Sequence, residues 1–537
     1  MGWRRGRSPL IDGWKRRIVV SKLPLLLITA IGWGFLLMSL GAIAILVTLV
    51  TAGVFALLGF LHASRHTMNL EDFVTSRNRF GSWMALSTVV ASAMGAWILF
   101  SPPEVGATSG IVGIIGYCIG QAAPSTIFAG IGPRIRTLMP RGHSLNEYVF
   151  YRFGHAMYGL TVGIILFYMF IYLTAELTAI AKAVQIIADV PLGWTALVVI
   201  TATFIYTIYG GLGTTIFTDA IQFAIIVPLL FLCFAIALVA LGGWNTAIAP
   251  VLSNAPNLLS FNNLPGIKFG ATLVIAVIVA ELCNQATWQR VYACRSNQIV
   301  RRAFLGSTLV ILPLLLIAGL MGILGMHFGF NNDLAFFSLI QELSLPLWFM
   351  VLVLVLALAL VMSSLDTLLN GLASVFTLDL IRLFPRMRSP NLLRISRILT
   401  VAVGIPAILI ASQGYGVLYL FLLADLVCAG VFLPILLGLY SRRLSGAMAV
   451  VSSVSGIVAG ALFFPKPDYS PWLNIPWGGD LLVSFIAPIV VSGTVMAMWS
   501  AIAAYRGKSY SFNFDTLNTQ IHHYGEPDPT EFAEVTK

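Results

Sequence analysis

Residues 346–367 read PLWFMVLVLVLALALVMSSLDT, an apolar run that ends in a cluster of oxygen-bearing side chains. Between Pro346 and Met362 the only polar side-chain atom is the indole nitrogen of Trp348. About 20 apolar residues suffice for a helix to cross a bilayer. A carboxylate and three hydroxyls beside such a run are costly in a membrane, and their oxygens are the ligands that a hard cation such as Na⁺ prefers. The stretch therefore predicts a membrane helix that carries an ion site.

The composition extends this prediction to the whole chain. Of its 537 residues 58% are hydrophobic and only 10% are charged, with a mean hydropathy of +0.91. A water-soluble protein does not need so much apolar surface, so we expect an all-α polytopic membrane protein with about 14 transmembrane helices. The apolar runs of spanning length lie near 23–40, 42–62, 82–109, 111–132, 155–180, 193–211, 214–241, 267–289, 303–326, 346–381, 393–412, 416–440, 445–464 and 480–505. The first two runs could also form a single long, tilted helix.

The basic residues predict the orientation in the membrane. The net charge is +10, and 28 of the 31 Lys and Arg residues fall in the stretches 1–22, 62–82, 133–153, 290–302, 382–397, 441–444 and 506–537. Alternate loops that collect positive charge are typical of the cytoplasmic side, so both termini are expected there, in a cell membrane. This distribution argues against nucleic acid as a partner. The five cysteines show neither metal-binding spacing nor a disulfide framework.

Two of the predicted helices have interrupted sequences. The run 82–109 contains Pro102-Pro103, and the run 267–289 carries Glu281, Asn284 and Gln285 in its second half. Broken helices are tolerated in a membrane only where free backbone groups meet a cavity or a ligand. The two runs lie five helices apart, so they cross in opposite directions. This pattern is typical of inverted-repeat transporters, which bind solute and ions near the membrane midplane.

Four stretches resemble the sodium/solute symporters, a family that includes carriers of proline, sugars, sialic acid and urea. The resemblance covers roughly residues 42–445, and its motifs are ALS…SAMGAW at 85–97, YGGL…TDAIQ at 209–222, MSSL…FTLD at 362–379, and NQ…WQR at 284–290. It implies a LeuT-like five-plus-five inverted repeat. The expected parts are a basic N-terminus 1–22, peripheral helices 23–62, a first repeat 82–241, a second repeat 267–440, peripheral helices 445–505 and a cytoplasmic tail 506–537.

The resemblance also implies a function and a sodium site. The chain is expected to be a sodium-coupled secondary active symporter that imports a small polar organic solute, such as proline, by alternating access. The sodium ligands carried over by position are the backbone carbonyls of Ala91, Met94 and Leu360 and the hydroxyls of Ser363 and Ser364. The alternative for the two serines is a hydrogen bond back to carbonyls one turn earlier in the helix.

One position departs from the family pattern. Many proline-type relatives carry Asp just before the position of Met94, whereas this chain has Ala93. Asp366 could replace that acidic group. It could instead complete a second cation site with Asp219 and Thr367, because sialic acid carriers hold a second sodium with the equivalent residues. A protonated or hydrogen-bonded Asp366 is the third interpretation, because two nearby carboxylates repel each other unless a cation or a proton lies between them.

The solute site is expected beside the helix breaks. The candidate residues are Trp97, Ser101, Glu176, Asn284, Gln285 and Asp425. Carboxyl groups within apolar helices favour either a positively charged solute or a protonation step in the cycle. They could also be neutral or hydrogen-bonded to the backbone, and Trp97 could stack on the solute or simply pack. The segment near Trp97 resembles proline carriers and the segment 284–290 resembles urea carriers, so the substrate stays open.

Other functions are weighed against sodium symport. Proton coupling through Glu176 or Asp425, or carriage of urea or a cationic solute by the same fold, is the main alternative. A transporter-like sensor would need a signalling domain, and the tail 506–537 is too short for one. A channel fits broken helices less well than alternating access. No enzyme motif is found, so no catalytic residues are expected, and the oligomeric state stays open.

Overall fold

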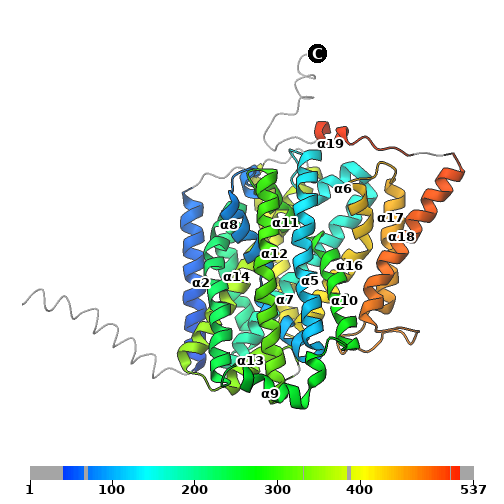
Figure 1. Ribbon diagram of the computed structural model, residues 1–537. Coiled ribbons are helices and arrows are strands. Elements are labelled where there is room, and N and C mark those ends of the chain that lie inside the picture. The colour runs from blue at the N-terminus through cyan, green and yellow to red at the C-terminus, as the bar shows by residue number, and fades with distance from the viewer. Residues whose placement is uncertain (1–39, 66–69, 331, 384–388, 508–509, 521–537) are drawn as a thin grey trace, which may run out of the picture.

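The computed structural model describes residues 40–65, 70–330, 332–383, 389–507 and 510–520, and its regular structure in these ranges is all helical (Figure 1). The long helices run nearly parallel to one axis, with α6 and α19 at one end and α9 and α13 at the other (Figure 1). In chain order the helices are α2 (Leu40–Ser64), α3 (Leu70–Val74), α4 (Ser82–Ala93), η1 (Ala96–Leu99), α5 (Ser101–Leu138), α6 (Leu145–Phe153), α7 (His155–Ala188), α8 (Leu192–Ala240), α9 (Trp244–Asn254), η2 (Pro256–Leu259), α10 (Leu264–Glu281), α11 (Gln285–Ala293), α12 (Asn297–Gly325), η3 (Met326–Phe328), α13 (Ala335–Glu342), α14 (Leu347–Leu383), α15 (Ser389–Ala411), α16 (Val417–Gly438), α17 (Gly446–Phe463), α18 (Leu481–Tyr505) and α19 (Asp515–Gln520).

Eleven helices in the described ranges are long and apolar enough to cross a membrane. A helix suits a bilayer because it satisfies its backbone hydrogen bonds internally. Two shorter apolar helices, Ser82–Ala93 and Leu192–Thr207, accompany them. Residues 23–39 of the predicted run 23–40 lie outside the described residues, so the number of fourteen stays a prediction.

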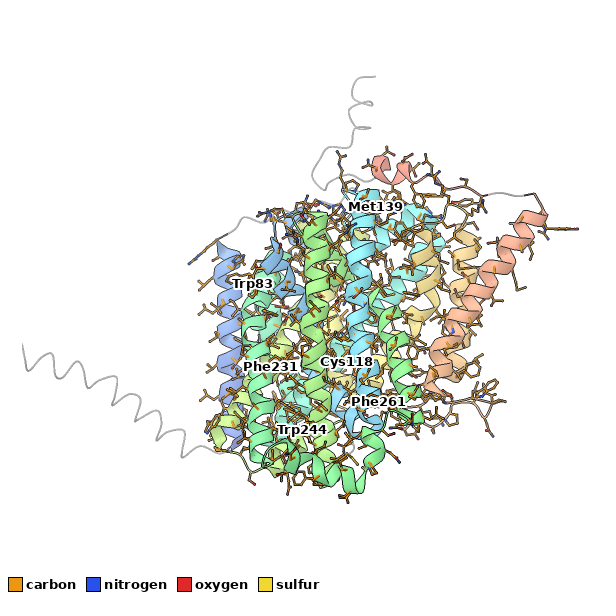
Figure 2. All side chains as sticks on the ribbon, viewed as in Figure 1. Trp83, Cys118, Met139, Phe231, Trp244 and Phe261 are labelled. Atoms are coloured by element: carbon orange, nitrogen blue, oxygen red, sulfur yellow. The ribbon has the colours of Figure 1, made fainter. Side chains whose placement is uncertain are left out.

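The outer surface of the bundle is apolar. Trp83 is 62% exposed and Phe261 is 70% exposed, and both lie on the outside of the bundle (Figure 2). Large apolar side chains that face outward along the whole length of a bundle mark contact with an apolar medium. The sequence and the surface therefore agree on a membrane setting.

Two glycine kinks fall where the sequence predicted helix boundaries. Gly110 has a φ of +70° inside α5, between the runs predicted at 82–109 and 111–132. A Cβ atom there would lie 2.2 Å from the backbone oxygen of Leu258, so only glycine fits. Gly211 has a φ of +54° inside α8, at the boundary predicted between 193–211 and 214–241. The kinks divide both helices into the predicted segments.

α14 lies inside the bundle and brings its polar end into the interior. It packs against α2, α4, α7, α8 and α15. Every residue from Val361 to Asn370 is buried, including the hydroxyls and the carboxyl group of the opening cluster. These polar groups therefore face other helices rather than the surroundings of the bundle, and they require partners or ligands there.

Candidate functional site

The first broken helix lies between α4 and η1. α4 ends at Ala93, and the backbone of Met94 and Gly95 is extended before η1 begins at Ala96. Glu176 of α7 stabilises this break, because its Oε2 atom accepts a hydrogen bond of 2.8 Å from the backbone nitrogen of Ala96. A Cβ atom on Gly95 would lie only 1.6 Å from Glu176 Oε1. The carboxyl group therefore packs directly against the glycine of the break.

The second broken helix lies between α10 and α11. α10 ends at Glu281, and Asn284 caps α11 by accepting a hydrogen bond of 3.1 Å from the backbone nitrogen of Ala286. The Asn284 amide also donates to Glu281 Oε1 at 3.1 Å, and the Thr287 hydroxyl donates to the same oxygen. A carboxyl group thus lies at each of the two breaks. Glu176 and Glu281 each accept hydrogen bonds from residues at the start of the helix that follows the break.

The predicted sodium ligands lie where α14 packs against α4 and η1. All five residues, Ala91, Met94, Leu360, Ser363 and Ser364, are buried. The Ser363 hydroxyl donates to Asp219 Oδ1 at 2.6 Å, and the Ser364 hydroxyl faces the carboxyl group of Glu176. Neither hydroxyl bonds back to the preceding turn of α14. Buried hydroxyls beside a helix break fit a hard cation, because such a cation prefers oxygen ligands, which include hydroxyl groups and backbone carbonyls.

Arg290 lies against the residues that the sequence suggested for a second cation. Its Nη2 atom donates to Asp219 Oδ2 at 2.8 Å and to the Thr367 hydroxyl at 2.6 Å. Its Nε atom donates to the Thr88 hydroxyl at 2.9 Å, and Thr88 in turn donates to Asp219 Oδ2 at 2.5 Å. We assigned Arg290 to a cytoplasmic loop at 290–302, and that assignment is wrong. The side chain is only 2% exposed, because α11 continues to Ala293 and turns it inward.

Asp366 lies near this group without contacting the guanidinium. Its Oδ2 atom accepts hydrogen bonds of 3.1 Å from the Tyr206 hydroxyl and of 3.1 Å from the Thr218 hydroxyl. Its Oδ1 atom is buried and has no partner among the described residues. The acidic group of the opening cluster is therefore held by neutral donors.

A cavity between α5, α7, α10 and α16 gathers aromatic and acidic side chains. Trp97 lies 5.7 Å from Tyr117 and 6.0 Å from Phe421 between ring centroids, and Tyr172 lies 4.8 Å from Phe421. The cavity is lined by Trp97, Tyr117, Gln121, Tyr168, Tyr172, Leu273, Val277, Ala280, Glu281, Leu418, Phe421, Leu422 and Asp425. The geometry is that of an aromatic enclosure with two carboxyl groups in its wall.

Of these two carboxyl groups, Glu281 also lines a neighbouring cavity together with Arg290, whereas Asp425 has no cationic partner in the described part of the chain. Asp425 is 7% exposed, and no hydrogen bond or ion pair engages its carboxyl group there. Glu281 accepts only from Asn284 and Thr287, which are neutral. A buried carboxyl group is either paired with a cation or protonated. Asp425 therefore requires a positive group in the cavity or a proton.

Only two of the six predicted solute residues line this cavity. Trp97 and Asp425 line it, whereas Glu176 binds the break at Ala96. Asn284 lines an adjacent polar cavity, and Glu281, Tyr172 and Gln121 line both. Ser101 is buried at the start of α5, with its hydroxyl next to Tyr117 of the cavity wall. Glu281 and the tyrosines were not among the predicted solute ligands, although Glu281 was visible in the sequence as a charge within an apolar run.

Gln285 instead joins α11 to a charged cluster at the α6 end of the bundle. Its amide donates to the backbone oxygen of His143 at 3.2 Å. The His143 ring lies 2.7 Å from Glu71 and 3.2 Å from Glu147, measured to carboxylate oxygens. Burial lowers the pKa of His143, but Glu147 and Glu71 outweigh it and raise that pKa above 6.5. Burial raises the pKa of Glu71, but His143 and Arg77 hold it at about 2. This cluster is thus built to hold opposite charges together.

Several known transporters are similar to the chain. It is 27% identical over 433 residues to the spermidine transporter of Candida albicans, a match that covers 76% of this chain and 78% of that protein. It is 28% identical over 392 residues to the sodium/glucose cotransporter of Vibrio parahaemolyticus, with 65% and 70% covered. These relatives are transporters, so the expectation that the chain is not an enzyme is confirmed.

Solved structures share the fold. A Na⁺-coupled sialic acid symporter matches with a TM-score of 0.68 at 19% identity, over 86% of this chain and 98% of that one. A transporter of the nucleobase-cation-symport-1 family matches with a TM-score of 0.53 at 13% identity, over 81% and 96%. At these identities the likeness concerns the fold alone. It confirms an all-helical transporter fold, whereas the five-plus-five layout stays a prediction.

The family itself is given by a sequence model. The model of the sodium:solute symporter family matches residues 73–456, which include both helix breaks and the whole of α14. The chain is thus an integral membrane transporter that binds a small solute and sodium ions. It belongs to the sodium:solute symporter family, and Na⁺ is its coupling ion.

Proposed function

We propose that the chain uses the Na⁺ gradient to import an organic amine that carries positive charge. The observation behind this proposal is the aromatic cavity with the carboxyl groups of Glu281 and Asp425 in its wall, where no cation among the described residues pairs with Asp425. A protonated amine supplies that cation. The faces of Trp97 and Tyr172 can add cation–π attraction to it.

The leading expectation from the sequence was a small polar solute such as proline. Proline is a zwitterion: its protonated amine could pair with one acidic group, but its carboxylate would enter a cavity that already holds two such groups. Like charges in a site of low dielectric repel strongly. Urea carries no charge and would leave Asp425 without a partner. The similarity to the spermidine transporter of Candida albicans supports the same choice. The cationic alternative is therefore preferred.

The transport cycle is proposed to follow alternating access. Na⁺ would bind between the Ala91–Met94 break and Ser363 with Ser364, and the amine would bind beside Trp97. Repeats 82–241 and 267–440 would then move against each other around these sites. The orientation expected from the basic loops places the α6 end at the cytoplasm of a cell membrane.

The test is uptake into proteoliposomes that contain the purified chain. Spermidine, putrescine, proline and urea are offered separately, with an inward Na⁺ gradient and with a pH gradient alone. We expect Na⁺-driven uptake of the two amines and none of the other solutes. Uptake of proline alone, or uptake driven only by the pH gradient, would refute the proposal.

A pair of variants ties the result to the cavity. Removing one partner of a buried charge pair costs about 3 kcal/mol or more, so Asp425→Asn should weaken amine affinity roughly a hundredfold or more. Asp425→Glu keeps the charge and is the matched control, so it should retain most of the affinity. Equal behaviour of the two variants would assign the residue a structural role.

A further inference from the structure

The guanidinium of Arg290 joins helices that the chain places far apart in sequence. It donates to Asp219 of α8 and Thr367 of α14 through Nη2, to Thr88 of α4 through Nε, and to the backbone oxygen of Ala286 through Nη1 at 3.1 Å. All of these side chains are buried. The contacts are direct and charge-assisted, so the guanidinium is a fixed part of the interior.

The guanidinium lies where the sequence suggested that a second Na⁺ could bind. Asp219 and Thr367 offer a carboxylate and a hydroxyl, which with Asp366 form the oxygen set that the sequence suggested for a second Na⁺. Arg290 donates to two of these three residues. A guanidinium and a sodium ion each carry one positive charge, and they would repel each other on the same oxygens. Unless Asp366 were ionised as well, a sodium ion beside Arg290 would leave a surplus positive charge in a buried site, which is costly.

We propose that Arg290 is a built-in cation that takes the place of a second sodium ion. In this chain Asp219 is neutralised by the guanidinium, and one Na⁺ binds at the Ser363 and Ser364 hydroxyls. The Ser363 hydroxyl connects the two sites, because it donates to Asp219 Oδ1 at 2.6 Å. Arg290 thereby positions a sodium ligand and sets the number of sodium ions carried in each cycle.

The inference depends on sodium coupling and not on the identity of the solute. Its test uses Na⁺ alone, as equilibrium binding of radioactive Na⁺ to the purified full-length chain without any solute. We expect one bound ion per wild-type chain. Arg290→Ala frees the oxygens of Asp219 and Thr367, so the number should double to two. Adding Asp219→Asn to that variant should return it to one. Arg290→Lys keeps a positive charge and should bind one ion, as the wild type does.

Two outcomes would overturn the inference. One is the binding of two ions by the wild-type chain. The other is the binding of a single ion by Arg290→Ala at every pH where that variant is folded. Stabilisation of the variant by Na⁺ in a thermal melt shows that it is folded. If Arg290→Ala does not fold, the Na⁺ dependence of wild-type thermal stability decides in its place. A Hill coefficient of one supports the built-in cation, and a coefficient near two contradicts it. A failure of amine uptake would leave both measurements unaffected.

Discussion

Replacing Gly95 by alanine tests whether Glu176 holds the first helix break. The φ of Gly95 is −96°, which alanine adopts without strain, so the backbone itself does not require glycine. The added Cβ atom would lie 1.6 Å from Oε1, 2.3 Å from Cδ and 2.6 Å from Oε2 of Glu176. These distances are far below van der Waals contact. The carboxyl group must therefore leave the backbone nitrogen of Ala96, or the break must shift.

The magnitude follows from this overlap. Forcing an extra methyl group into a packed site costs about 1–3 kcal/mol, and an overlap with three atoms of one rigid carboxyl group belongs at the upper end. Since 1.4 kcal/mol corresponds to a factor of ten, Gly95→Ala should weaken apparent Na⁺ affinity roughly a hundredfold. Sodium affinity is the sensitive quantity because the carbonyls of Ala91 and Met94 lie at the displaced end of α4.

The assay is Na⁺-dependent thermal stabilisation of the purified variant, titrated to saturation. Gly81→Ala is the matched control, because Gly81 caps the other end of the same helix and nothing lies within 4 Å of its added Cβ atom. That variant should bind Na⁺ as the wild type does. Glu176→Asp shortens the acidic side chain by one methylene group and should restore part of the affinity of Gly95→Ala. Wild-type Na⁺ affinity in Gly95→Ala would refute the role given to Glu176.

Three further predictions concern the sodium site, the cavity and the α6 end. Ser364→Ala removes one oxygen ligand of a cation, worth about 1.5–3 kcal/mol, and should weaken Na⁺-dependent stabilisation roughly tenfold to a hundredfold; an unchanged titration would exclude Ser364 as a ligand. Glu281→Gln removes one of two carboxyl groups, so uptake of spermidine should fall more than uptake of a monoamine; equal losses would contradict a two-carboxylate site. The raised pKa of His143 means that its pairing with Glu71 and Glu147 stabilises the fold fully below pH 6.5 and that this contribution is lost as the pH rises through the raised value. The melting temperature of His143→Gln should therefore lack a decline in that range that the wild type shows, and parallel curves would reject the assignment.

Much of the fold could be read from the sequence because a membrane helix is a local structure. Its length and apolar composition predicted α7, α12 and α14, and the turns at Gly110 and Gly211 were predicted within a residue or two. The breaks were also visible, since Asn284 and Glu281 are polar interruptions of an apolar run. The Ser363–Thr367 cluster was recognisable for the same reason. Residues three and four apart share one face of a helix, so their proximity does not depend on other elements.

The sequence could not show which side chains contact these polar groups across the bundle. Arg290 follows a short polar segment and has the pattern of a loop residue, yet α11 turns it inward to Asp219, 71 residues earlier in the chain. Glu176 reaches the backbone of Ala96 across 80 residues. Glu281 and Asp425 share a cavity only because α10 packs against α16.

The sequence by itself determined that the chain is a helical membrane protein with two interrupted helices, and it predicted a cation site at Ser363 and Ser364. It did so because hydrophobicity and helical periodicity act over a few neighbouring residues. Only the tertiary structure decided which buried carboxyl group is paired with a cation of the chain and which carboxyl groups lie in the wall of a cavity. Charge compensation depends on distances between helices, and those distances are set by side-chain packing across the whole bundle. Asp219 therefore has Arg290 as its partner, whereas Asp425 has no cationic partner among the described residues.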